Sequence, residues 1–99
     1  MRGIQNKEDT SYTIGLLANV VCEEFGVTIN ELCSSEKRRE LVRARAVLAR
    51  AAQMKKGLGL RVVCEFLKKH HGTVSRLAVT ARKDQRLESL ATSLIDISE

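Results

Sequence analysis

The chain has 99 residues, a formal charge of +5, and no proline or tryptophan. That length allows one domain with one modest core, and no apolar run is long enough to cross a membrane. Only three residues are aromatic, which argues against recognition of single strands by ring stacking. Helix-favouring residues dominate, so we expect an all-α fold. The polar start predicts a flexible segment over residues 1–9 before a domain over 10–99.

The first predicted helix runs from Thr10 to Phe25, where apolar residues recur at steps of three and four. Gly26 follows as a helix-stop signal. The pattern T-x-x-E that starts at Thr28 is typical of a capping box and predicts a short helix over residues 29–33.

A long helix is predicted from Glu36 to Lys56, with Ser34 or Ser35 as its N-cap. At about 100° per residue, one face is apolar and the opposite face carries arginines. A solvated face is the plain alternative for such a stripe. The stripe comprises Arg39, Arg43 and Arg50, with Arg38 and Arg45 flanking its boundary.

Two short helices are predicted after a glycine-rich break at residues 57–59. The first runs from Leu60 to Leu67, a polar turn covers residues 68–71, and the second helix runs from Gly72 to Lys83. Such a pair joined by a tight turn predicts a helix-turn-helix. The outward stripe of the second helix comprises Thr73, Arg76, Thr80 and Lys83.

The last predicted helix runs from Arg86 to Ile97, after an interruption at Asp84 and Gln85. We expect it to pack back on the core, which gives a compact domain of five to six helices. The alternative is that its apolar edge meets a partner chain, which would make this helix a site of self-association.

The positive charge is concentrated in one part of the chain. Residues 36–83 hold fourteen Lys or Arg and three acids, a local charge of +11, while the segments on either side each sum to −3. Charge clustered on a helix-turn-helix is the electrostatic footprint of a DNA-binding module. The alternative is surface charge that only keeps a small domain soluble.

Catalysis, metal binding and a cofactor are not expected from this sequence. The three cysteines lack a paired C-x₂-C spacing, and we expect them to be reduced thiols in a cytoplasmic protein. His70 and His71 are adjacent, so they cannot supply the usual i, i+4 ligand pair. Neither converging carboxylates, a nucleophile triad nor a phosphate loop is present. We expect neither a small-molecule substrate nor a membrane partner.

Two blocks of residues carry a resemblance to a known family. The first is Lys37-Arg38-Arg39-Glu40-Leu41-Val42-Arg43-Ala44-Arg45, preceded by Gly26-Val27 and Glu31-Leu32. The second runs from Gly57-Leu58-Gly59-Leu60 to His71-Gly72-Thr73-Val74-Ser75-Arg76. Together they resemble the C-terminal DNA-binding domain of the bacterial replication initiator DnaA. The spacing from Gly57 to Val74 is one residue shorter than in DnaA and closer to the DnaA-like domain of REP-associated tyrosine transposases.

The resemblance implies a Trp-repressor-like all-α fold that binds duplex DNA, with the second short helix in the major groove. It places His70, His71, Gly72 and Thr73 at the start of that helix, Lys37 toward the minor groove and Arg45 toward the phosphate backbone. The family's Asp is His70 here, a Ser or Thr is Gly72, and a capping Ser is Gly59. The DnaA-box sequence therefore cannot be assumed as the target.

The residues themselves divide the expected DNA contacts into two groups. Thr73, Arg76 and Thr80 are candidates for base edges in the major groove, and Arg76 could equally meet a phosphate. The candidates for phosphate contacts are Arg43, Arg45, Arg61, Lys68, Lys69 and Lys83. About six such contacts predict a salt slope, the slope of log binding constant against log salt concentration, near −5. Arg38 and Arg39, near the start of the predicted long helix, are further candidates for DNA contact. The alternative function is a helical protein-interaction or structural module with an incidental basic surface.

Overall fold

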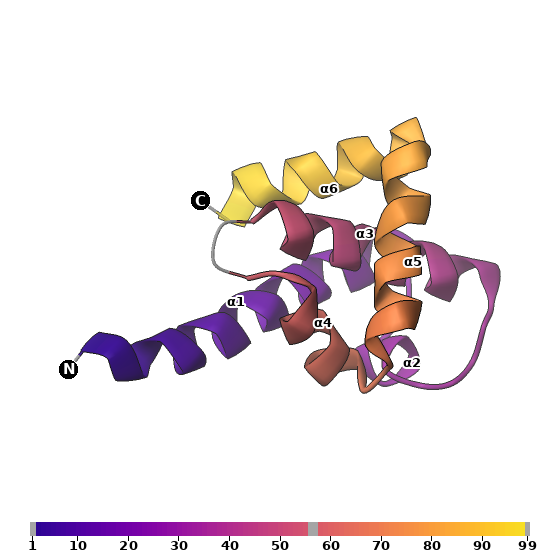
Figure 1. Cartoon of the computed structure of the whole chain (residues 1–99). Helices are drawn as coiled ribbons and strands as arrows, with labels where there is room; N and C mark the ends of the chain where they lie inside the picture. Colours follow the sequence, from indigo (N-terminus) through magenta and orange to yellow (C-terminus); the bar gives the residue numbers. More distant parts are fainter. Residues whose placement is uncertain (1, 56–57, 99) are drawn as a thin grey trace.

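The computed structural model describes the backbone of residues 2–55 and 58–98, and the side chains of residues 13–55 and 58–95. Within those ranges the chain forms helices and no strands, which confirms the all-α prediction (Figure 1). The helices are α1 (Arg2–Phe25), α2 (Ile29–Leu32), α3 (Arg39–Met54), α4 (Leu60–Leu67), α5 (His71–Lys83) and α6 (Gln85–Ser98).

Helix α1 begins at Arg2, well before Thr10, where apolar periodicity predicts its start. The backbone of the segment expected to be flexible, residues 1–9, is therefore helical from residue 2 onward. The helix ends as predicted at Phe25, and the φ of 67° at Gly26, which follows, lies in the left-handed region that glycine adopts without strain. The buried face of α1 comprises Ile14, Leu17, Ala18, Val21 and Cys22.

The capping box of α2 forms as its sequence predicts. The Thr28 amide donates to Glu31 Oε1 at 2.9 Å, and the Glu31 amide donates to Thr28 Oγ1 at 3.1 Å. Each bond satisfies an amide that a short helix would otherwise leave unpaired.

Helix α3 begins at Arg39, so the predicted start at Glu36 and the predicted serine caps are wrong. The Ser34 hydroxyl instead donates to the Glu31 carbonyl at 2.6 Å and accepts from the Glu36 amide at 3.2 Å. Its hydrogen bonds thus order a loop that leads into the helix. The helix ends at Met54, and the predicted end at Lys56 and the Gly57 break lie outside the described residues.

Helix α3 is the centre of the molecule and packs against each of the other five helices. Its most extensive contact is with α5, which crosses it in Figure 1. Because much of its surface is alanine, neighbouring helices can approach closely. Its buried residues are Leu41, Ala44, Arg45, Ala46, Val47, Leu48, Ala49, Ala51 and Ala52.

Helix α4 has the predicted bounds, and α5 begins one residue earlier than predicted. Asp84 alone separates α5 from α6, so the predicted interruption at Gln85 is wrong. Asp84 Oδ1 accepts from the amides of Arg86 at 3.0 Å and Leu87 at 3.4 Å, and it therefore caps α6. Leu87, Ala91 and Leu94 are buried, which confirms that α6 packs back on the core.

Candidate nucleic-acid interface

The turn between α4 and α5 is short because Lys68 takes up a left-handed backbone conformation, with φ 58° and ψ 48°. The Lys69 amide then donates to the Cys64 carbonyl at 3.1 Å and closes the end of α4. Three residues, 68–70, therefore redirect the chain from one helix into the next. This arrangement is the helix-turn-helix that the sequence predicts.

The outer face of α5 lies in solvent along its whole length. Val74, Ala78 and Ala81 are buried on the inner face. The four predicted outward residues, Thr73, Arg76, Thr80 and Lys83, are all exposed. The Thr80 hydroxyl donates to the Arg76 carbonyl at 3.0 Å, so its single donor is already used within the helix.

The start of α5 is also open. His70, His71 and Gly72 are exposed. His70 occupies the N-cap position with φ −67° and ψ 149°, but its side chain makes no capping hydrogen bond. The first amides of α5 therefore receive no bond from that side chain, as the replacement of a family Asp by His70 implies.

Exposed cations precede this helix in the chain and also lie in its last turn. Arg61 on α4 and Lys68 in the turn are exposed, and the Arg61 side chain makes only a loose 3.8 Å pair with Glu65 on its own helix. Arg82, which sequence reasoning did not select, is exposed in the last turn of α5. The sequence contained a sign of this residue, because Arg82 stands next to Lys83, which was selected, at the basic end of the same helix.

The loop between α2 and α3 carries the second group of exposed cations, Lys37 and Arg38, with Arg39 directly after it. Arg38 is partly neutralised, because it pairs with Glu31 at 3.0 Å and with Glu36 at 3.3 Å. The Glu31 pKa is lowered chiefly by the hydrogen bond from the Thr28 amide and further by Arg38. Lys37 and Arg39 have no such acidic partner among the described residues.

The prediction that Arg45 faces the DNA backbone is wrong, because its side chain is buried. Its side chain is only 3% exposed and makes four hydrogen bonds to backbone carbonyls: Nε to Leu32 at 2.8 Å, Nη1 to Glu36 at 2.7 Å, and Nη2 to Ser34 at 2.8 Å and Glu31 at 3.1 Å. A guanidinium held in this way cannot reach a phosphate. The sequence held a signal for this, since Arg45 lies about 40° from Leu41, within the apolar face.

The arginine stripe of α3 is also shorter than predicted. Arg39 is exposed and Arg43 is half-buried, but Arg50 forms a two-bond ion pair with Glu88 of α6. An acid thus covers the far end of the stripe. The part that remains available is the start of α3, which follows the basic loop.

Lys69 is engaged as well, although it lies in the turn. Its Nζ donates to the Ser34 carbonyl at 2.9 Å, the same oxygen that Arg45 Nη2 binds. Burial, followed by the neighbouring Arg45 charge, lowers the pKa of Lys69. Lys68, one residue earlier, is exposed, and its side chain forms no hydrogen bond or ion pair within the described part of the chain.

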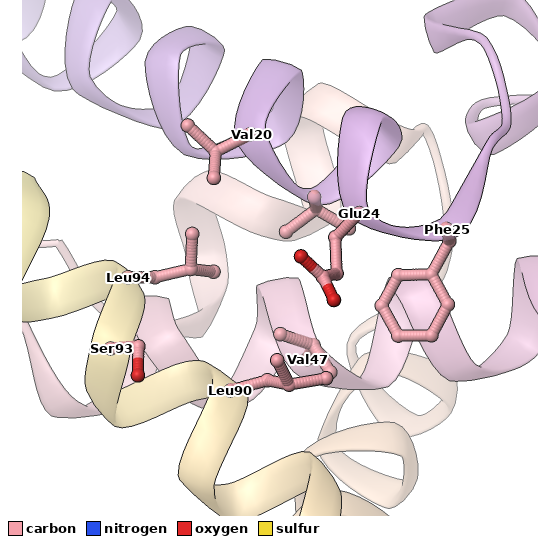
Figure 2. A pocket seen from close by; sticks show the side chains of 8 residues that line it. Val20, Glu24, Phe25, Val47, Leu90, Ser93 and Leu94 are labelled. Atoms are coloured by element: carbon pink, nitrogen blue, oxygen red, sulfur yellow. The ribbon is translucent and has the colours of Figure 1, made fainter.

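A small apolar cavity lies away from these cations, between α1, α3 and α6 (Figure 2). Its volume is about 60 Å³, well below the roughly 300 Å³ at which small-molecule sites begin. Among the described residues, no three His, Cys, Asp or Glu side chains gather as a metal site requires. No described helix has the length and apolar character needed to cross a membrane.

Two short helices joined by a three-residue turn, with a basic outer face on the second, define a helix-turn-helix DNA-binding domain. Residues 14–78 match the family described as the bacterial DnaA protein helix-turn-helix. That match covers more than half of the chain, so the chain belongs to this family, which confirms the resemblance seen in the sequence. The matched residues end within α5, and α6 lies beyond them.

Two proteins with sequences similar to this chain are each named chromosomal replication initiator protein DnaA. The protein from Pseudothermotoga lettingae is 35% identical over 77 residues, which cover 78% of this chain and 16% of the relative. The protein from Mycoplasma pneumoniae is 31% identical over 84 residues, which cover 81% of this chain and 19% of the relative. The chain thus spans less than a fifth of the length of either relative. No solved structure gives a significant match.

Proposed function

We propose that the domain binds duplex DNA with α5 in the major groove. The observation that carries this proposal is the exposed stripe of Thr73, Arg76, Thr80 and Lys83 on the second helix of a helix-turn-helix. In the major groove every base pair presents its own donor and acceptor pattern. Arg76 is the strongest candidate for a base contact, because its planar fork matches the two acceptors of guanine.

The cations around α5 hold the phosphate backbone in this proposal. Arg61, Lys68 and Lys83 lie on the first helix, the turn and the second helix of the helix-turn-helix, and Arg43 lies on α3. His71 and Gly72 approach the DNA at the start of α5, where amide groups and the helix dipole favour an anion. Such contacts set the register of the protein on the duplex and do not themselves read sequence.

The basic loop before α3 reaches the neighbouring minor groove. Lys37 and Arg39 are free to do so because neither has an acidic partner among the described side chains. Arg38 contributes less, since its charge is shared with Glu31 and Glu36. Cations inserted there read mainly the width of the groove and the A·T content.

The domain acts as a non-catalytic, DNA-targeting module of a larger cytoplasmic protein. Both relatives carry the name of a replication initiator and are more than five times as long as the matched stretch. Any chemistry of the larger protein then lies outside residues 10–99, and no cofactor or small-molecule substrate is required here. A transposase-related parent remains a prediction from the spacing of the signature alone.

Titration of fluorescent duplex DNA with the 99-residue chain at about 50 mM salt tests the proposal. We expect binding that weakens as salt rises and that Arg76→Ala reduces. The matched control is Arg86→Ala, because Arg86 is an exposed arginine that lines a depression beside Glu24 and Ser93. Absence of binding, or equal effects of the two variants, would overturn the proposal and favour a protein-interaction module.

A further inference from the structure

The loop between α2 and α3 owes its conformation to one buried arginine. Residues 33–38 form no regular helix, yet their carbonyls and those just before them converge on the guanidinium of Arg45. The four oxygens belong to Glu31, Leu32, Ser34 and Glu36, and the four distances lie between 2.7 and 3.1 Å. Bonds from a charged donor are among the stronger hydrogen bonds in proteins. Arg45 therefore holds the segment that ends in Lys37.

Two further contacts join this loop to the helix-turn-helix. Lys69 Nζ, from the turn, donates to the Ser34 carbonyl at 2.9 Å. Cys33 Sγ donates to the Phe66 carbonyl at 3.4 Å, near the end of α4. The Ser34 oxygen is thus shared between a cation from α3 and a cation from the turn that leads into α5.

We infer that Arg45 and Lys69 are positioning residues, which set the basic loop at a fixed place relative to α5. This inference rests on the proposed function. The two DNA-contacting parts, the cations of Lys37 and Arg39 and the outer face of α5, then form one preorganised surface. Because the loop is ordered before binding, the complex loses less conformational entropy than it would with a free loop.

Removing a positioning residue should affect DNA affinity differently from removing a phosphate contact. A residue that acts through the loop affects DNA affinity only while the loop carries its cations. A residue that contacts a phosphate acts independently of the loop and also contributes about one unit to the salt slope. A double-mutant cycle separates the two, because residues that act through each other show an interaction free energy.

The first experiment combines Lys69→Met with the loop variant Lys37→Ala/Arg39→Ala in the 99-residue chain. Methionine keeps the apolar stem of lysine and removes the ammonium group. We expect Lys69→Met to weaken duplex binding about three- to tenfold in the otherwise native chain, and less than about twofold in the loop variant. The salt slope should be unchanged by Lys69→Met.

Lys68→Met is the matched control, since Lys68 is the adjacent, exposed lysine of the same turn and does not bond to the loop. We expect its effect to be the same in both backgrounds and to lower the salt slope by about one. Arg45→Lys, which keeps the charge and loses the fork, should behave like Lys69→Met. If Arg45→Lys does not fold, the Lys69 cycle decides the question by itself.

A second measurement needs no DNA. Hydrogen exchange at the amides of residues 35–38 should be faster in Lys69→Met than in Lys68→Met, because Lys69, unlike Lys68, bonds to that loop. If the native chain binds DNA but the Lys69 effect is additive with the loop variant, or loop exchange is unchanged, the positioning role is wrong and the proposed function stands. If the native chain does not bind duplex DNA, the proposed function itself fails.

Discussion

Arg50 on α3 donates two hydrogen bonds to Glu88 on α6, from Nε to Oε1 at 2.8 Å and from Nη2 to Oε2 at 3.0 Å. Arg50 Nη1 also donates to Gln53 Oε1 at 2.7 Å. The pair joins the last helix to the central one and neutralises the charge of Arg50. The hydrogen bond from Arg50 lowers the Glu88 pKa, and the same bond raises the pKa of Arg50.

Replacing Glu88 with Gln should destabilise the fold at neutral pH. The bidentate geometry is good, but both side chains are partly solvated, at 17% and 31% exposure, so we expect a loss of only about 0.5–1 kcal/mol. The Glu88 pKa is lower in the folded state than in the unfolded state. Its contribution is therefore complete above the unfolded value and disappears as pH falls through the folded value.

Urea unfolding of both proteins at neutral pH and at an acidic pH below about 3 checks this. We expect the difference in free energy of unfolding between the native chain and Glu88→Gln to shrink toward zero in acid. A difference that stays constant with pH would show that the ion pair does not contribute through the charge of Glu88.

The salt dependence of DNA binding should be shallower than the sequence alone predicts. Six candidate phosphate contacts imply a slope near −5, but Arg45 and Lys69 are both engaged at the Ser34 carbonyl. The four that remain are Arg43, Arg61, Lys68 and Lys83, which implies a slope of about −4. Affinities measured across about 50–200 mM salt test this, and a slope near zero would contradict phosphate contact altogether.

Much of the helix-turn-helix could be predicted from the sequence, because α4 and α5 each bury one narrow apolar face. Leu67, Val74 and Ala78 follow that periodicity, and the exposed stripe on α5 lies opposite them. The family could also be recognised from the sequence, because the R-A-R block and the residues around Thr73 resemble its signature. These features depend on local spacing, which a single sequence shows directly.

The roles of Arg45 and Ser34 could not be predicted in the same way. The partners of Arg45 are backbone carbonyls 9 to 14 residues away, and no side-chain pattern marks a carbonyl. The Ser34 hydroxyl is used within the loop, so α3 starts at Arg39 without a side-chain cap. A polar residue before a helix favours a cap only when no nearer partner competes for it.

Replacing His70 with Asp should stabilise the domain. His70 already has N-cap backbone geometry, and its carbonyl accepts from the Val74 amide at 3.1 Å, but its side chain caps nothing. A carboxylate there can accept from the open amides of α5 and lies at the positive end of the helix dipole, which is worth about 1 kcal/mol.

The control is His71→Asp, one residue inside the helix, which gains the dipole term without the capping bond. Thermal unfolding at neutral pH should rank His70→Asp above His71→Asp, and both above the native chain. Equal stabilisation by the two variants would mean that charge alone accounts for the effect.

The role of Arg76 can be resolved by comparing Arg76→Lys with Arg76→Ala on a duplex selected by the native chain. If Arg76 donates its fork to guanine, lysine keeps the charge but loses the paired geometry. Arg76→Lys should then retain affinity for unrelated duplex DNA while its preference for the selected site falls about 5- to 150-fold, the equivalent of 1–3 kcal/mol. Replacing the contacted guanine should change the affinity of Arg76→Lys little and that of the native chain strongly.

If Arg76 meets only a phosphate, Arg76→Lys should bind every duplex nearly as well as the native chain does. Arg76→Ala should then weaken binding to every duplex by the same factor.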